Sequence, residues 1–199
     1  MDERPGPRER IVRAAAALFL ARSYTGVGIA EICAAADVRK GTLYHFFPSK
    51  AEIGKAVLDW HAAAFDRHFT RAEHANGEIA ALVGAVTGVQ SGIERRFGRI
   101  VGCPMGNLAA ELATTEVEVR EHLARIFAAW EERLAVGCRR AAAAGRLRAG
   151  VDPERMAHLL LAQVQGAILL AKARERTAAE IVADVDELLR LYLVTEVAV

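Results

Sequence analysis

Cysteine and serine are scarce in this sequence, and motifs of the common enzyme classes are missing. The 199 residues include three cysteines, Cys33, Cys103 and Cys138, with no C-x-x-C pair. That pattern indicates neither a zinc ribbon nor a disulfide framework. Three serines are present, and no G-x-S-x-G, H-E-x-x-H, Walker or dinucleotide-binding motif occurs. We therefore expect a protein that is not an enzyme.

Metal sites, export signals and membrane spans are not indicated either. His61 and His68 share a helix face, but no carboxylate or cysteine cluster accompanies them, so we expect no metal and no cofactor. The N-terminus is charged and lacks the apolar core of a signal peptide. The longest apolar stretch, Met156 to Ala173, is interrupted by polar residues, which favours a buried helix over a membrane span. We expect a cytoplasmic protein without a membrane partner.

Helix formers dominate what is present. Aromatic residues make up 6% of the chain, and only five prolines occur, whereas alanine, leucine, glutamate and arginine are abundant, which favours helices over strands. Capping boxes, in which a hydroxyl residue precedes a glutamate by three positions, are predicted at Ser49–Glu52, Thr115–Glu118 and Thr177–Glu180. Asp152-Pro153 predicts a further helix start, and Asn76-Gly77 predicts a turn. The sequence therefore predicts an all-α fold of about nine helices.

Basic residues are concentrated near the N-terminus. Residues 1–55 hold nine Lys or Arg against six Asp or Glu, a balance of +3, while the remainder, with 17 against 19, is −2. This asymmetry has the direction expected of a DNA-binding end. Two short helical segments lie there, Ile29 to Ala36 and Arg39 to Phe47, with a break at Asp37-Val38.

The second short segment has the residues that reading the DNA major groove requires. It opens with Arg39, Lys40, Gly41 and Thr42. The N-terminal residues of a recognition helix meet the base edges, and Gly41 would let the backbone approach the duplex closely. Tyr44, His45 and Lys50 are expected near phosphates. A basic amphipathic turn on any helical protein would look similar, so the motif alone leaves both interpretations open.

The string from Ile29 to Lys50 closely resembles the DNA-binding signature of the TetR family of bacterial regulators. Its core is Lys-Gly-Thr-Leu-Tyr at 40–44, followed by Phe-Pro-Ser-Lys at 47–50. The resemblance implies a three-helix helix-turn-helix DNA-binding domain over residues 1–53 and a helical-bundle ligand-binding and dimerisation domain over 54–199. It also implies a homodimer on a palindromic operator in double-stranded DNA, most commonly a repressor released by a small-molecule effector. The implied DNA contacts are Arg39, Lys40, Thr42, Tyr44 and Lys50.

Four positions depart from the family pattern. Val27-Gly28 stands where Thr-Ser is frequent, so the usual hydroxyl cap before the second helix is missing. Asp37 replaces the glycine common in the turn. Phe46 replaces a tyrosine or histidine, and its ring cannot donate a hydrogen bond to a phosphate. These departures keep open a second interpretation, a helical ligand-binding adaptor that does not bind DNA.

A second segment, Gly102-Cys103-Pro104-Met105-Gly106-Asn107-Leu108, looks like one found in a branch of TetR-like regulators that includes repressors of drug-resistance and electrophile-detoxification genes. In that branch the segment lies at the effector pocket. Exposed amides and the helix dipole favour a thiolate at a helix N-terminus. We predict that Cys103 senses electrophiles or oxidants and that Lys172 stabilises its thiolate. The alternatives are a small hydrophobic wall residue with a lysine that extends to solvent, or an enzyme nucleophile without any supporting motif.

Further candidates for an effector pocket share an aromatic, sulfur or amide side chain on a predicted helix: Trp60, Phe65, Met105, Asn107, Phe127, Trp130 and Gln163. An aromatic residue at helical spacing is more often part of the core. The last two predicted helices carry long apolar faces, and Gly166 would allow another helix to approach closely. By the resemblance, these helices form the homodimer interface, although leucines that face the protomer's own core would give the same pattern.

Overall fold

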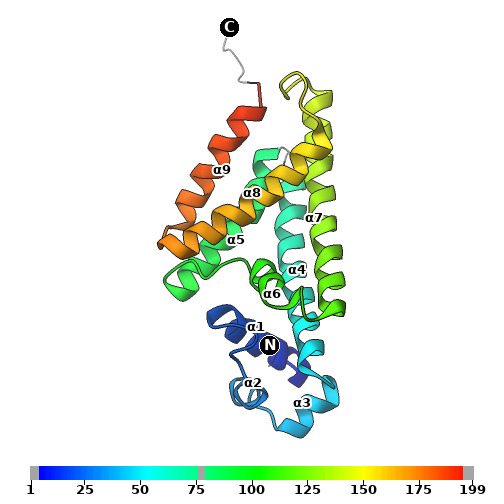
Figure 1. Cartoon of the computed structure of the whole chain (residues 1–199), viewed down its shortest axis with the longest axis vertical. Coiled ribbons are helices and arrows are strands. Elements are labelled where there is room, and N and C mark those ends of the chain that lie inside the picture. Colours follow the sequence, from blue (N-terminus) through cyan, green and yellow to red (C-terminus); the bar gives the residue numbers. More distant parts are fainter. Residues whose placement is uncertain (1–4, 76–78, 195–199) are drawn as a thin grey trace. The chain divides into compact units, whose positions relative to one another are not determined.

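The structure, a computed structural model, describes residues 5–75 and 79–194, and within them it consists of helices and loops (Figure 1). The described residues form nine helices, α1 (Pro7–Ala21), α2 (Ile29–Ala36), α3 (Lys40–Phe46), α4 (Lys50–Ala75), α5 (Ile79–Phe97), α6 (Pro104–Leu112), α7 (Val117–Ala143), α8 (Pro153–Arg174) and α9 (Ala178–Tyr192). Extended pairing in the described ranges is limited to one isolated antiparallel bridge between Leu147 and Leu193. The predicted all-α fold of about nine helices is confirmed. The predicted turn at Asn76-Gly77 lies outside the described residues.

Two predicted helix starts are confirmed in detail. Thr177 caps α9, since its hydroxyl accepts from the Glu180 amide (3.3 Å) and the Glu180 carboxylate accepts from the Thr177 amide (2.8 Å). Asp152 caps α8 by accepting from the Arg155 amide at 2.6 Å. Each of these bonds satisfies a helix amide that has no partner within its helix.

The capping boxes at Ser49 and Thr115 have different outcomes. Ser49 Oγ accepts from the Glu52 amide (3.2 Å) at the start of α4, as predicted. The box at Thr115 is wrong. A helix capped by Thr115 would begin at Glu116, whereas α7 begins at Val117. The Thr115 amide instead donates to the Leu112 carbonyl at the end of α6 (3.1 Å). The Glu118 carboxylate binds Lys55 Nζ at 2.8 Å, so it serves a contact between helices.

The chain packs into two compact units. The N-terminal unit joins Met1–Ala63 with Pro104–Ala124, and the C-terminal unit joins Ala64–Cys103 with Arg125–Val199. Helix α6 therefore packs with the N-terminal helices, and it contacts α1. The predicted domain boundary at residue 53 stays a prediction.

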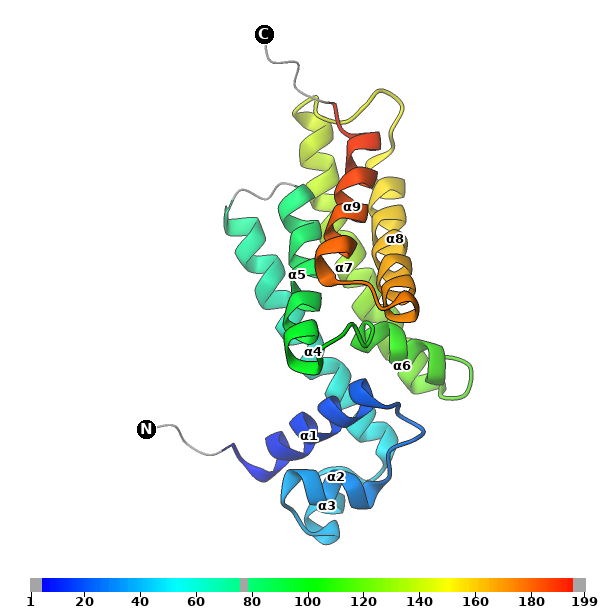
Figure 2. The ribbon, with the colours of Figure 1, turned by 90° about the vertical axis from the view of Figure 1, so that its left-hand side faces the viewer.

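Helices α1, α2 and α3 pack against one another in the N-terminal unit (Figure 2), and their apolar side chains form the core of this unit. Ile11 of α1, Ile32 of α2 and Leu43 of α3 are fully buried. Burial of side chains this large stabilises the unit by about 1.5–3 kcal/mol each. The short helices α2 and α3 thus depend on α1 for their position, since helices of this length are marginal alone.

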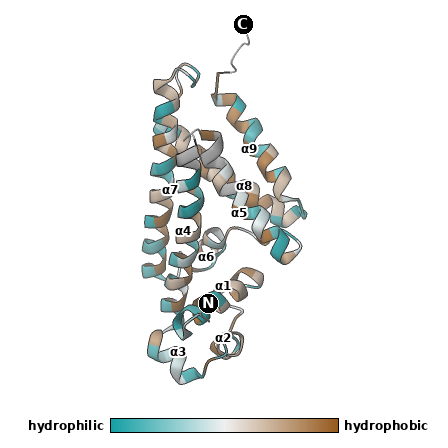
Figure 3. Ribbon diagram, turned by 180° about the vertical axis from the view of Figure 1, so that it is seen from behind, coloured by the Kyte–Doolittle hydropathy of each residue, from teal (hydrophilic) through white to brown (hydrophobic). Residues whose placement is uncertain are grey.

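In the C-terminal unit, α9 packs against α5 and α8. Figure 3 shows hydrophobic and hydrophilic residues alternating along α9, as expected for a helix buried on one face. Helix α8 is long and apolar enough to cross a membrane by length and composition, but its inner residues Met156, Leu160 and Val164 are buried in the protein core. Its outer residues Leu169 and Leu170 are exposed, so the expected buried helix is buried on one side.

Candidate nucleic-acid interface and effector region

Helix α3 presents a polar face to solvent. Leu43 is fully buried and anchors the helix, and Phe47 is buried directly after it. The exposed residues of the segment are Arg39, Lys40, Gly41, Tyr44 and His45, while Thr42 is half-buried. Lys40 Nζ lies 5.7 Å from the centroid of the Tyr44 ring one turn later. The predicted DNA-contacting residues other than Lys50 and Thr42 are thus accessible on one short helix, as direct readout of a groove requires.

The turn between α2 and α3 is closed by main-chain bonds and by Arg10 of α1. Asp37 adopts the left-handed conformation (φ 53°), which glycine adopts most easily but aspartate also tolerates. The missing glycine therefore leaves the turn intact. Arg10 Nε donates to the Ala36 carbonyl and Arg10 Nη2 donates to the Asp37 carbonyl, both at 3.0 Å. These bonds satisfy carbonyls at the C-terminal end of α2.

Helix α2 begins without a hydroxyl cap, as Val27-Gly28 predicted. No side-chain cap hydrogen bond is made by Gly28. The Glu31 carboxylate instead accepts from the Gly28 amide at 2.8 Å and pairs with Arg22. The Gly28 amide, and then the Arg22 guanidinium, hold the pKa of Glu31 below its usual value. Of the two reciprocal bonds of a capping box, α2 therefore has only the one in which the Glu31 carboxylate accepts from the amide of the N-cap residue.

Lys50, the first residue of α4, lies close to Tyr24 in the loop before α2. Its Nζ is 4.3 Å from the centroid of the Tyr24 ring and 6.0 Å from that of Phe19. Burial lowers the pKa of Lys50, against the opposing effect of the Glu111 and Glu31 carboxylates. A cation at this distance over a ring is attracted to the ring face. Lys50 therefore has a contact within the protein that the sequence did not indicate.

Glu111 of α6 holds the same loop by hydrogen bonds. Its carboxylate accepts hydrogen bonds from the Tyr24 amide, the Thr25 amide and the Thr25 hydroxyl, each at 3.0 Å. Burial raises the pKa of Tyr24 to about 12, and the carboxylates of Glu116 and Glu111 add to the rise. The loop that leads into α2 is therefore fixed to α6 by three hydrogen bonds to a charged acceptor, which are stronger than neutral ones.

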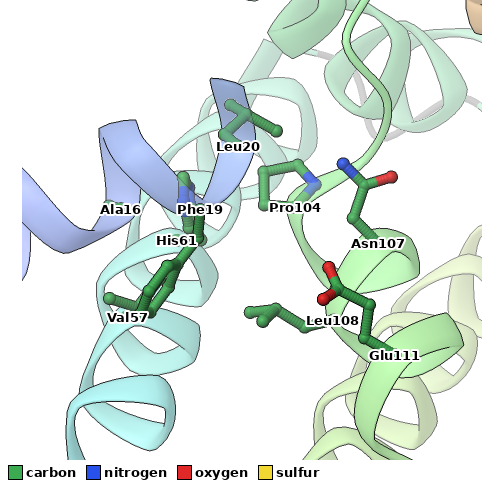
Figure 4. A pocket seen from close by; sticks show the side chains of 9 residues that line it. All are labelled: Ala16, Phe19, Leu20, Val57, His61, Pro104, Asn107, Leu108 and Glu111. Atoms are coloured by element: carbon green, nitrogen blue, oxygen red, sulfur yellow. The ribbon is translucent and has the colours of Figure 1, made fainter. Parts of the chain in front are cut away.

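A small cavity separates α6 from α1 and α4 within the N-terminal unit (Figure 4). Its lining residues are Ala16, Phe19 and Leu20 of α1, Val57 and His61 of α4, and Pro104, Asn107, Leu108 and Glu111 of α6. The volume of about 10 Å³ is close to the minimum for one water molecule. The predicted pocket residue Asn107 thus faces this cavity together with Glu111 (Figure 4).

The predicted sensor residues lie in different environments. Cys103 is 4% exposed and directly precedes Pro104, the first residue of α6, and Met105 is fully buried. Lys172 is exposed near the end of α8. The predicted stabilisation of the Cys103 thiolate by Lys172 stays a prediction. Burial, and then the Glu154 carboxylate, raise the pKa of Cys138 to about 11, which keeps that cysteine in its thiol form.

The aromatic pocket candidates fall mainly in the core of the C-terminal unit. Phe65 and Trp130 are each 1% exposed, and their ring centroids are 4.4 Å apart. Phe127 is half-buried and meets Trp130 edge-on at 5.8 Å. Trp60 lies in the N-terminal unit, where it lines a surface hollow beside Arg8, and Gln163 is exposed on α8. Aromatic side chains packed as closely as Phe65 and Trp130 contribute primarily to the hydrophobic core.

Comparison with known proteins places the chain in a family. Residues 79–184, more than half of the chain, match the family described as the tetracyclin repressor-like, C-terminal domain. Residues 11–57 match the bacterial regulatory proteins, tetR family. The chain belongs to the TetR family of bacterial regulators. It is therefore a DNA-binding transcriptional regulator that responds to a ligand, and it is not an enzyme.

Individual relatives agree with this assignment. The transcriptional regulator AcuR of Cereibacter sphaeroides is 32% identical over 173 residues, which cover 84% of this chain and 77% of AcuR. The transcriptional repressor DhaR of a Mycobacterium species is 30% identical over 171 residues, which cover 83% and 82% of the two chains. A TetR regulatory protein of Rhodobacter sphaeroides superimposes with a TM-score of 0.83 at 29% identity, over 94% of this chain and 98% of that one. The TetR fold of this chain is thus shown by both sequence and structure.

The roles of two residues in this TetR-family chain were not predicted from the sequence. Glu111 binds a loop 86 residues earlier in the chain, and no local pattern reveals such a pairing. Gln90 is fully buried in α5. A signal for Gln90 was present, because it stands in the apolar stripe of α5 between Val86 and Ile93, at helical spacing.

Proposed function

We propose that this regulator is a repressor that binds a palindromic operator in double-stranded DNA as a homodimer and is released by a small molecule or an electrophile. It acts in the cytoplasm, without a membrane partner or a cofactor. The observation that carries the proposal is the accessible polar face of α3, formed by Arg39, Lys40, Gly41, Tyr44 and His45 around a fully buried Leu43. The relative DhaR is named a repressor.

Residues 1–53 form the proposed DNA-binding domain, and residues 54–199 form the proposed ligand-binding and dimerisation domain. In this proposal, the first turn of α3 meets base edges, with Arg39 reading a base, and Lys40, Thr42, Tyr44, His45 and Lys50 contact the duplex around it. Two such helices in a homodimer would read half-sites about 34–36 Å apart, or a multiple of that distance.

The outer faces of α8 and α9 support the proposed homodimer. Leu169 of α8 is 63% exposed and Leu191 of α9 is 62% exposed, although both are large apolar side chains. A Cβ atom added to Gly166 would meet no atom within 4 Å in the protomer, so a second helix has room to approach there. Exposed apolar side chains on adjacent helices are typical of an interface between protein chains.

The effector part of the proposal rests on the start of α6. The segment from Gly102 to Asn107 supports membership of the branch that includes electrophile-detoxification repressors. Cys103 precedes α6, and Glu111 lies eight residues later, about 12 Å along a helix, where it holds the loop before α2. A ligand or adduct at Cys103 that shifts α6 would therefore change how that loop is held. Met105 and Asn107 lie between the two points.

The first experiment is footprinting of the purified protein on DNA from immediately upstream of its own gene. A protected palindrome is expected. N-ethylmaleimide should then release the wild-type protein from this DNA and leave the Cys103→Ala variant bound. Both proteins keep Cys33 and Cys138. Absence of protection by a folded protein would favour the helical adaptor, and equal release of both proteins would remove Cys103 from the effector response.

Replacing Gly41 by alanine should stabilise the protein and weaken operator binding. A Cβ atom at position 41 meets no protein atom within 4 Å, and alanine favours a helix over glycine by up to about 1 kcal/mol. The melting temperature should therefore rise by about 2–4 °C. If α3 lies against the duplex, the added methyl group should reduce operator affinity by about tenfold.

Gly88→Ala in α5 is the matched control, because a Cβ atom there also meets nothing within 4 Å. It should raise the melting temperature in the same way and leave operator affinity unchanged. Operator affinity that is equally unchanged in Gly41→Ala would remove α3 from the DNA interface.

Lys40→Ala and Lys50→Ala should differ in their effect on stability. Each phosphate contact that is lost lowers the slope of log K against log salt by about one, and we expect this for both variants. Lys50→Ala alone should also lower the melting temperature, because it removes the ammonium 4.3 Å from the Tyr24 ring. An unchanged salt slope for Lys50→Ala, measured by titrating salt in the operator-binding assay, would reduce Lys50 to a positioning residue.

A further inference from the structure

Gln90 of α5 is a buried amide without a partner. Its side chain is fully buried, and neither Oε1 nor Nε2 has a hydrogen-bond partner in the protein. Among the described residues, it is the one buried side chain that is polar or charged. An unsatisfied buried polar group lowers the stability of the folded protein by about 1–3 kcal/mol, and Gln90 carries two such groups, Oε1 and Nε2.

The surroundings of Gln90 would accept an apolar residue. It lies on the same face of α5 as Ile93, which is buried one turn later, and α5 packs against α8 and α9 in the C-terminal unit. Methionine has nearly the same length and shape as glutamine and would fill this position without an unpaired group. A buried amide with neither of its groups paired within the protein points to a partner outside the chain, either a bound molecule or an ordered water.

The chemistry of Gln90 restricts that partner. The amide offers one acceptor and two donor hydrogens, so a matching group must both donate and accept. The group must also be uncharged, because the described core holds no buried charged side chain to pair with an ion. Helix α8, which packs against α5, holds a second shielded amide nitrogen without a partner, Gln165 Nε2.

We propose that Gln90 is the polar anchor of an effector site in the C-terminal unit, and that this site takes a small uncharged molecule with a carboxamide-like group. Its carbonyl accepts from Gln90 Nε2, and its N–H donates to Gln90 Oε1. This inference rests on the proposed effector response and names the chemical class of effector. Its test is independent of operator binding.

The test measures the melting temperature of the full-length protein with benzamide, benzoate or no addition, for the wild type, Gln90→Met and Ala129→Met. Ala129 is exposed on α7 of the C-terminal unit, so its variant is the control for introducing a methionine. Without a ligand, Gln90→Met should melt about 2–4 °C above the wild type, because the unpaired amide is gone. Benzamide should raise the melting temperature of the wild type and of Ala129→Met, and bind Gln90→Met about tenfold more weakly.

Three outcomes would overturn the proposal. A lower melting temperature for Gln90→Met would mean that the amide is satisfied within the protein or by an ordered water alone. Equal benzamide binding by the wild type and Gln90→Met, or no binding to either, would remove Gln90 as an anchor. A shift by benzoate equal to that by benzamide would overturn the uncharged class. Operator affinity, measured on the same three proteins, reports separately on the proposed repressor function.

Discussion

Replacing Leu169 by glutamate should convert the proposed dimer into a monomer and reduce operator affinity by more than about a hundredfold. Leu169 is the most exposed of the large apolar side chains described, at 63%. If it lies in the interface, the variant places a carboxylate there without a partner, and a buried unpaired charge costs several kcal/mol. Each protomer would then hold only one half-site, and the energy of the second contact would be lost.

The oligomeric state is measured by light scattering of the eluting protein, and operator affinity by titration at fixed salt. Val117→Glu is the matched control, since Val117 is also large, apolar and exposed, but begins α7. It should leave both the dimer and the operator affinity unchanged. A Leu169→Glu protein that stays dimeric would place the interface elsewhere on the chain.

Replacing Glu111 by alanine should loosen the loop before α2 and weaken operator binding. The carboxylate accepts three hydrogen bonds, from the Tyr24 amide, the Thr25 amide and the Thr25 hydroxyl. Hydrogen bonds to charged groups contribute about 1.5–3 kcal/mol each, with losses that do not add fully. We therefore expect the free energy of unfolding to fall by about 2–4 kcal/mol.

Hydrogen exchange separates this local effect from general destabilisation. In Glu111→Ala, the Tyr24 and Thr25 amides should exchange faster by a larger factor than the amides of α1 or α4. Glu111→Gln keeps the shape but not the charge, and its effect should be intermediate. Glu121→Ala, on the exposed side of α7, is a control for loss of a surface carboxylate. Uniform acceleration across the N-terminal unit would contradict a specific hold on the loop.

Local patterns in the sequence predicted most of the fold. The starts of α4, α8 and α9 follow from residues within three positions of one another, and the structure shows the predicted bonds at Ser49, Asp152 and Thr177. The failure at Thr115 has a physical reason. Glu118, the glutamate of that predicted box, is held by Lys55 of α4, so a tertiary contact overrides the local cap.

The site was less predictable, because its decisive contacts join distant residues. The motif indicated which residues of α3 to expect at the DNA, but not that Lys50 lies over Tyr24 or that Glu111 holds the loop at Thr25. Gln90 is different: its place in an apolar stripe was visible, whereas its lack of a partner required the packed core. Pairings across many residues depend on the fold as a whole and leave no periodic trace.

The contacts of Arg10 bear on which residues natural variation can change. Arg10 donates to the carbonyls of Ala36 and Asp37, which every amino acid possesses. Substitutions at those two positions therefore leave the hydrogen bonds available as long as the backbone keeps its path, and at position 37 that path suits glycine, asparagine or aspartate. Arg10 has no such latitude, because lysine has no planar group that can donate to two carbonyls at once. Substitutions at positions 36 and 37 should therefore be tolerated more often than substitutions of Arg10, which lies 26 positions before Ala36.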